Sequence, residues 1–200
     1  MTEPTAHEGF PLLDTARLRL RQFGAPDLPG FLAYRNDPEI ARYQSWDTYS
    51  EAEGHAFLSQ QLQTAPGTPG AWCQFALEHK ATGRLLGDCA LQVDAVEQRQ
   101  GQIGFTLARE NQGKGFATEA VARLLDYGFS ELLLHRIIAI TDSENTAAGS
   151  LLDRVGMRRE GYFRQNVWFK GRWGSEYLYA MLEHEWQEGL PRLHHARQRR

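Results

Sequence analysis

The chain is poor in cysteine, with Cys73 and Cys89 as its two examples among 200 residues. Both lie in strand-like runs without the spacing of metal ligands, so we expect buried free thiols rather than a disulfide or a nucleophile. A disulfide-stabilised scaffold is thereby excluded, and we expect no metal.

Long apolar runs are also missing. No stretch approaches the ~20 apolar residues that a membrane-spanning helix needs. The opening residues 1–9 are polar, include Pro4 and lack the apolar core of a signal peptide. We therefore expect no membrane association and a cytoplasmic location.

The chain lacks an excess of charge of either sign. Its 22 lysines and arginines nearly balance 25 aspartates and glutamates, which gives a formal net charge of −3. Such a charge creates no strong field for a polyanion, so nucleic acid is not an expected partner. The length suits one domain with a sizeable core. We divide the chain into a polar N-terminal tail (1–12), one domain (13–186) and a basic C-terminal tail (187–200).

Strand-like and helical patterns alternate along the domain without an internal repeat. The capping-box spacing of Ser50-Glu51-Ala52-Glu53 opens a helix, and Lys80-Ala81-Thr82-Gly83 joins two strands into a hairpin. Strands are predicted at 17–21, 72–77, 85–93, 101–107, 136–141, 158–168 and 172–182, and helices begin near 27, 50, 115 and 145. This order predicts a mixed α/β (α+β) domain, whose mostly antiparallel twisted sheet is flanked by helices.

The most informative run is Gln112-Gly113-Lys114-Gly115-Phe116-Ala117, which lies between a strand-like segment ending at Leu107 and an amphipathic segment continuing to Leu134. A strand, a glycine turn and a helix start bring several backbone N–H groups to one point, where a pyrophosphate can accept hydrogen bonds. Neither common nucleotide motif fits, because Thr118 replaces the last glycine of G-x-G-x-x-G and Lys114 lies between the glycines. We predict a phosphorylated cofactor here, with a plain turn and helix cap as the alternative.

The remaining pattern, Gln112, Gly115 and Ala117 in a Q-x-x-G-x-A run, resembles the acetyl-CoA pyrophosphate loop of the GNAT N-acetyltransferases. From about Leu13 to Trp186 the chain is similar to their subgroup of ribosomal-protein N-terminal acetyltransferases. Five segments carry the likeness in order: Thr15–Arg21, Gln102–Leu107, Gln112–Ala120, Asn145–Ala147 and Val155–Gly161.

The resemblance implies a single GNAT-like domain with acetyl-CoA as donor, an amine as acceptor and no metal. The loop residues would hold the pyrophosphate mainly through backbone N–H groups; they are Gln112, Gly113, Lys114, Gly115, Phe116 and Ala117. The preceding strand would splay from its neighbour and bind the pantetheine arm like an added strand; its residues are Phe105, Thr106, Leu107 and Ala108. Asn145 matches a family asparagine whose amide meets that arm, although a plain helix cap also explains an asparagine there.

The candidate base follows from a departure from the family pattern. Members often carry a glutamate where this chain has Gln102, and an amide is no base. Glu160, just after the short helix, lies at a position comparable to a glutamate of some related enzymes, so the resemblance makes it the candidate that deprotonates the amine. A surface carboxylate paired with Arg158 or Arg159 explains Glu160 equally well.

A second departure concerns the proton donor to the leaving thiolate. Relatives typically carry a serine three residues after the asparagine, where this chain has Ala148. Tyr162 is the candidate substitute, with an ordinary aromatic strand residue as the alternative.

Two function classes follow from these residues. The first is an acetyl-CoA-dependent N-acetyltransferase acting on a primary amine, either a protein N-terminus or a small molecule. The second is a non-catalytic acyl-CoA-binding or sensing domain, which Gln102 and Ala148 motivate. The sequence predicts no particular oligomeric state.

Overall fold

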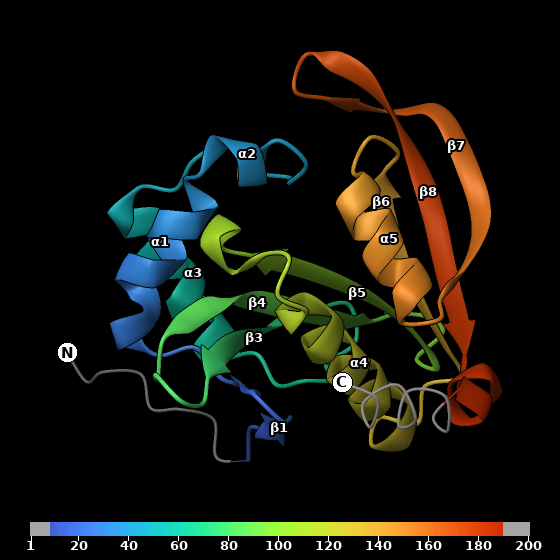
Figure 1. Ribbon diagram of the computed structural model, residues 1–200, viewed down its shortest axis with the longest axis horizontal. Helices are drawn as coiled ribbons and strands as arrows, with labels where there is room; N and C mark the ends of the chain where they lie inside the picture. Colours follow the sequence, from blue (N-terminus) through green and yellow to red (C-terminus); the bar gives the residue numbers. More distant parts are fainter. Residues whose placement is uncertain (1–8, 190–200) are drawn as a thin grey trace.

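Alternating apolar residues form an eight-stranded sheet in the computed structural model, which describes residues 9–189. The strands are β1 (Leu13–Asp14), β2 (Leu18–Arg21), β3 (Trp72–His79), β4 (Leu85–Val93), β5 (Gln100–Leu107), β6 (Arg136–Asp142), β7 (Arg158–Phe169) and β8 (Arg172–Leu182). Their order is β1-β2-β3-β4-β5-β6-β8-β7, and every pair is antiparallel except β5–β6 (Figure 1). The predicted mostly antiparallel sheet is confirmed.

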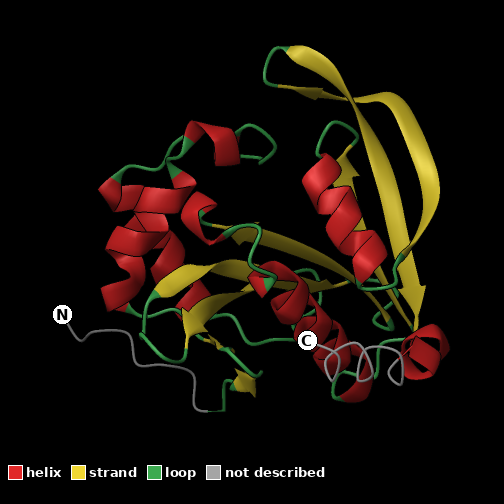
Figure 2. Cartoon of the chain, viewed as in Figure 1, coloured by secondary structure: helices red, strands yellow, loops and turns green. Residues whose placement is uncertain are grey.

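Helices lie on both faces of this sheet (Figure 2). They are α1 (Leu28–Arg35), α2 (Pro38–Ala41), α3 (Glu51–Leu62), α4 (Phe116–Ser130) and α5 (Thr146–Arg154), with 3-10 turns at Ala25–Asp27 and Arg109–Asn111. The predicted capping box starts α3, because the Ser50 hydroxyl accepts from the Glu53 amide and the Glu53 carboxylate accepts from the Ser50 amide. The sequence analysis did not predict β1 or α2.

Two predicted boundaries differ from the structure. The amphipathic segment does not stay helical to Leu134, because α4 ends at Ser130 and Leu133, at φ 54°, turns the chain toward β6. Residues 183–189 are helical, so a helix crosses the predicted start of the C-terminal tail. Of the two predicted tails, residues 1–8 and 190–200 lie outside the described part of the chain.

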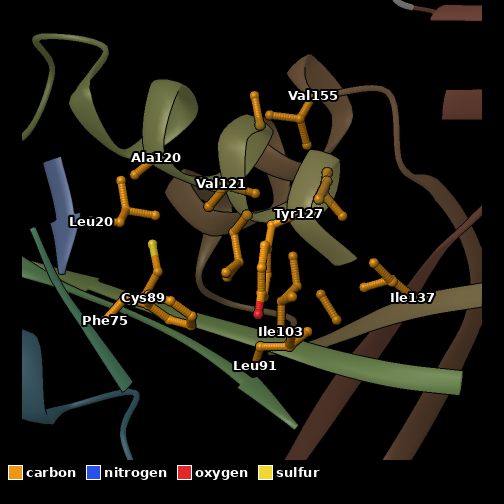
Figure 3. Packing of buried hydrophobic residues seen from close by; sticks show 14 of the residues in the cluster. Leu20, Phe75, Cys89, Leu91, Ile103, Ala120, Val121, Tyr127, Ile137 and Val155 are labelled. Atoms are coloured by element: carbon orange, nitrogen blue, oxygen red, sulfur yellow. The ribbon is translucent and has the colours of Figure 1, made fainter. Parts of the chain in front are cut away.

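One core lies between the sheet and α4 with α5. The α4 stripe of Val121, Leu124 and Leu125 is fully buried against strand residues such as Phe75 and Ile103 (Figure 3). Cys73 and Cys89 belong to this core as free thiols, as predicted, and burial raises the pKa of Cys73 to about 12. These thiols are therefore packing residues rather than nucleophiles.

The second core lies on the other face of the sheet, under α1 and α3. Strand neighbours alternate between the two cores, since Phe75 and Leu107 belong to the first and Ala76 and Ala108 to the second. The second core is aromatic, and Phe31 stacks on Phe57 at a centroid distance of 5.0 Å.

A buried ion pair ties this second core to the sheet. Arg35 and Asp88 are 3% and 2% exposed, and Arg35 Nη2 donates to Asp88 Oδ2 over 2.8 Å. Tyr34 Oη donates to the same oxygen over 2.5 Å. Burial, and then the Asp88 charge, raise the pKa of Tyr34 well above its usual range, so the phenol keeps the proton that it donates. The Arg35 guanidinium also lies over the Trp46 ring, 3.8 Å from its centroid.

A second polar cluster fixes the start of α4 to the start of β2. The Glu119 carboxylate, 9% exposed, accepts from Thr15 Oγ1 (2.5 Å), from the Arg17 amide (2.8 Å) and from Arg17 Nε (2.7 Å). Burial alone would raise the pKa of Glu119, but these hydrogen bonds outweigh it and hold the pKa below its usual value. Glu119 is therefore an ionised anchor for the helix start.

Asp88→Asn should lower the free energy of unfolding by about 3 kcal/mol, because it leaves a buried guanidinium without its counter-charge. Urea unfolding followed by circular dichroism measures the loss. Asp14→Asn is the matched control, since Asp14 is 50% exposed in its pair with Arg19 and such pairs contribute at most about 1 kcal/mol. Equal losses in the two variants would contradict the assigned role of Asp88.

Glu119→Gln should lower the free energy of unfolding by about 1–2 kcal/mol at neutral pH. The native pKa of Glu119 lies below that of an unfolded glutamate (~4.3), so its stabilisation is complete above that value and disappears as the pH falls through the native pKa. The difference between wild type and variant should therefore shrink between pH ~5 and ~3, as denaturant titrations would show. Glu131→Gln, which removes an exposed carboxylate just after α4, is the matched control, and a difference for Glu119→Gln that is independent of pH would refute the ionised anchor.

Candidate active site

The parallel ladder between β5 and β6 stops while both strands continue. It joins Gln100 to Arg136, Gly101 to Ile137 and Gln102 to Ile138, after which β5 runs on to Leu107 and β6 to Asp142. Each strand keeps its other neighbour, β4 for β5 and β8 for β6. The two strands therefore diverge within one sheet (Figure 1), which is the splay that the sequence analysis predicted.

The backbone of β5 presents hydrogen-bonding groups to this divergence. Asp94 N–H donates to Gln100 C=O and Ala108 N–H to Leu86 C=O, both over 2.9 Å. Because backbone groups alternate along a strand, those of Thr106 also point to β4, whereas those of Phe105 and Leu107 point toward β6. Of the four strand residues predicted to meet a pantetheine arm, the backbone geometry thus favours Phe105 and Leu107 and assigns the backbone groups of Thr106 and Ala108 to β4.

The glycine run forms an exposed turn directly before α4. Gly113 and Gly115 have φ values of 73° and 78°, which favour glycine. A Cβ on Gly113 would meet no atom within 4 Å, and one on Gly115 would meet Arg17 Nη2 at 3.4 Å. Gly115 is the N-cap of α4 and no side chain caps it, so the N–H groups of the first helical turn are available to an anion.

Two side chains outside the glycines shape this turn. Arg17 Nη1 donates to Lys114 C=O over 3.0 Å. In a trans peptide the next N–H points the opposite way, so the N–H of Gly115 faces away from Arg17. Gln112 Nε2 donates to Leu107 C=O over 3.0 Å and joins the turn to the end of β5. Phe116 is buried beneath the Arg17 guanidinium, 4.4 Å from its ring centroid, so its side chain is a packing residue.

Asn145 follows the diverging end of β6 and starts α5. Its Oδ1 accepts from the Ala148 amide over 3.1 Å, which confirms the helix cap. Because the cap uses the oxygen, the Nδ2 group of this half-buried side chain remains as a donor. The geometry of Asn145 is therefore compatible with both predicted roles, the helix cap and the contact with the pantetheine arm.

Glu160 lies at the other end of the strands. Its carboxylate pairs with Arg136 Nη2 over 2.6 Å and with Arg158; these hydrogen bonds, Arg136 first, lower its pKa to about 2. Arg136 is in register with Gln100 at the start of β5, whereas the glycine turn follows the end of β5. The structure favours the surface ion pair for Glu160, with Arg136 as a partner that the sequence analysis missed.

Tyr162 lies on β7 with 56% of its surface exposed, and its ring contacts that of Tyr177 at 5.2 Å. Tyr177 is the register partner of Tyr162 on β8 and of Thr141 on β6. Tyr177 therefore lies between Tyr162 and the diverging end of β6. The sequence analysis missed Tyr177 because strand register across a sheet leaves no local signal.

Arg17 and Glu119 were missed as individual residues. Both lie in segments that carry the family likeness, and that likeness was the one available signal. Within residues 9–189, no three histidine, cysteine, aspartate or glutamate side chains are grouped to hold a metal ion. No helix there has the length and apolarity to cross a membrane.

Comparison with known proteins agrees with this geometry. Residues 17–158 match the acetyltransferase (GNAT) domain model. The chain is 32% identical to the uncharacterized N-acetyltransferase p20 of Bacillus licheniformis over 87% of this chain and 97% of that protein. It is 31% identical to the [ribosomal protein uS5]-alanine N-acetyltransferase of Escherichia coli, over 44% of this chain and 45% of that protein.

A solved structure gives the same result. The spermidine N-acetyltransferase of Vibrio cholerae, in complex with CoA and spermine, superimposes with a TM-score of 0.75 and 26% identity, over 86% of this chain and 99% of that one. A matching family model over most of the chain, a diverging strand pair and a glycine turn before α4 lead to one conclusion: the protein belongs to the GNAT acetyltransferase family and is an acyltransferase.

Proposed function

We propose that the protein transfers the acetyl group of acetyl-CoA to a primary amine, either a protein N-terminus or a small-molecule amine. The observation that carries this proposal is the early end of the β5–β6 ladder. It leaves the backbone groups of Phe105 without a partner on β6; the glycine turn follows the end of β5, and Asn145 follows the end of β6.

Each part of this site suits one part of the donor. The amides of the glycine turn and of the first turn of α4 would bind the pyrophosphate, with the exposed Lys114 ammonium beside them. Phe105 would hydrogen-bond the pantetheine arm along β5 through its N–H and C=O groups, and Leu107 through its N–H, because its carbonyl accepts from Gln112 Nε2. Asn145 Nδ2 would donate to the same arm from the β6 side.

Acetyl transfer needs a neutral amine that attacks the thioester carbon, donors for the resulting oxyanion, and departure of the thiolate as the C–S bond breaks. Glu160, with a pKa of about 2 and two guanidinium partners, is a poor base. We therefore propose that the amine loses its proton to solvent before it binds. Tyr162 stays the predicted proton donor to the leaving thiolate. A thiolate also leaves readily without being protonated.

The acceptor class rests on the relatives. The Vibrio cholerae enzyme is named for spermidine, a small amine, and the Escherichia coli enzyme for an alanine of a ribosomal protein. These names support a small amine and a protein N-terminus as acceptors to test. The cytoplasmic location stays a prediction.

The function is tested by following free thiol while the protein is incubated with acetyl-CoA and a panel of primary amines and peptides. Acceptor-dependent thiol release supports the proposal. Tight acetyl-CoA binding in calorimetry without acceptor-dependent release would replace it with the acyl-CoA sensor.

Gly115→Val should weaken acetyl-CoA binding at least tenfold, about 1.4 kcal/mol, because the branched side chain crowds the amides of the turn. Calorimetry measures the dissociation constant. Gly83→Val is the matched control, since Gly83 also has a positive φ, of 66°, and open space around its Cβ but lies in the β3–β4 hairpin. An unchanged dissociation constant in folded Gly115→Val protein would remove the phosphate-binding role.

Glu160→Gln should change kcat/KM less than threefold and leave its pH profile in place, because general-base assistance, worth ~10²–10⁴-fold, is not what this carboxylate supplies. Steady-state rates of thiol release across pH with one good acceptor measure the effect. A loss of a hundredfold or more, with a shifted pH limb, would restore Glu160 as the base.

A further inference from the structure

A β-bulge interrupts β4 near its start. The register between β3 and β4 shifts between Leu77 and Glu78, where Leu86 of β4 has no partner. Such an extra residue bends its strand and increases the local twist. On its other side, β4 pairs with β5 without a shift, from Gly87–Leu107 onward. The irregularity beside the end of β5 therefore belongs to β4 and not to β5 itself.

Gly87 follows this bulge and leaves no room for a side chain. Its φ is 153°, and a Cβ there would lie 2.2 Å from the Thr106 carbonyl oxygen and 2.8 Å from Leu107 Cα. In an ordinary strand the Cβ points out of the plane of the sheet, whereas at Gly87 it would point into the neighbouring strand. Because a carbon and a carbonyl oxygen need ~3.3 Å, that oxygen would have to move by about 1 Å.

The peptide that a Cβ on Gly87 would displace is the one between Thr106 and Leu107. The C=O and N–H of a trans peptide point in opposite directions. The Thr106 C=O points to β4, so the Leu107 N–H points toward β6, beyond the last register pair of the β5–β6 ladder, Gln102–Ile138. The absence of a side chain at Gly87 thus determines how close to β4 this N–H lies.

At this point β4 is fixed more firmly than β5. The next residue, Asp88, is buried and accepts hydrogen bonds from Arg35 Nη2 and Tyr34 Oη, and Gly87 itself is in register with Leu77 of β3. The end of β5 has no strand partner on its β6 side. A side chain at position 87 would therefore displace the end of β5 and leave β4 in place.

We propose that Gly87 is a positioning residue for the acetyl donor, because it sets the position of the Leu107 N–H that would bind the pantetheine arm. Gly87 does not touch the donor and acts through the Thr106–Leu107 peptide. The position of the arm in turn places the thioester for attack by the amine. This inference rests on the proposed function, since it concerns the acetyl-CoA site of that proposal.

The test is Gly87→Ala, with two ligands titrated by calorimetry. One is acetyl-CoA, and the other is adenosine 3′-phosphate 5′-diphosphate, which carries the pyrophosphate of CoA without its pantetheine arm. We expect the dissociation constant of acetyl-CoA to rise at least tenfold, because the arm loses a well-placed donor. The constant of the arm-free nucleotide should change less than threefold, because the glycine turn and the start of α4 stay in place. Circular dichroism checks that the variant is folded.

Gly101→Ala is the matched control, because it crowds the same strand pair in the part where β5 and β6 are still paired. A Cβ on Gly101 would meet Leu134 Cδ1 at 2.8 Å and the Gln92 carbonyl oxygen at 3.0 Å, and Gly101 is in register with Ile137. This variant should lose stability and keep the wild-type dissociation constant for acetyl-CoA. An unchanged constant in folded Gly87→Ala protein, an equal loss for both ligands, or an equal loss in Gly101→Ala overturns the inference.

A measurement on the wild type does not depend on whether Gly87→Ala folds. Acetyl-CoA should slow hydrogen exchange at the Leu107 amide, and the arm-free nucleotide should not. Binding of acetyl-CoA without protection of this amide also overturns the inference and leaves the proposed function intact. A wild-type protein that binds no acetyl-CoA instead refutes the proposed function.

Discussion

The early end of the β5–β6 ladder is the constraint on which the rest of the structure depends. Three register pairs hold the two halves of the sheet together, and beyond them each strand follows its own antiparallel neighbour. A strand edge inside a sheet is normally paired or covered, and for this reason we propose the open edge of β5 as the binding position. The helices α4 and α5 follow the two strands. The first-turn amides of α4 have no side-chain cap, whereas Asn145 caps α5.

An opening of this kind needs anchors outside the ladder, and the anchors are polar contacts between distant segments. Glu119 holds the start of α4 to Thr15 and Arg17, and Arg17 in turn holds the carbonyl of Lys114. On the other face, the Arg35–Asp88 pair joins α1 to β4, the neighbour of β5. In both contacts a buried charge has an oppositely charged partner. Such a pair adds little net stability, but it fixes how the two segments lie relative to each other.

Local patterns predicted most of the elements, and long-range contacts explain what was missed. The capping box at Ser50, the hairpin across Lys80–Gly83 and the glycine turn depend on residues within one turn of each other, so sequence spacing was enough. Arg17–Glu119 and Lys170–Ala41 join residues 102 and 129 positions apart, for which the sequence offers no spacing rule. Glu160 shows the same limit. Its sequence neighbours suggested a pair with Arg158 or Arg159, but its carboxylate also binds Arg136, which is 24 positions away.

The two departures from the family pattern bear on how this chain would catalyse the transfer. With an amide at Gln102 and a methyl group at Ala148, the chain lacks an acid or base at the positions where relatives often have them, and Glu160 is held in an ion pair at the far end of the strands. We propose that catalysis then depends on orientation, which can supply ~7–11 kcal/mol when reacting groups are held in register. Orientation requires fixed surroundings on the acceptor side as well as the donor side. One fixed contact beside the diverging strands is that of Lys170, whose hydrogen bond to the Ala41 carbonyl ties the β7–β8 turn to α2.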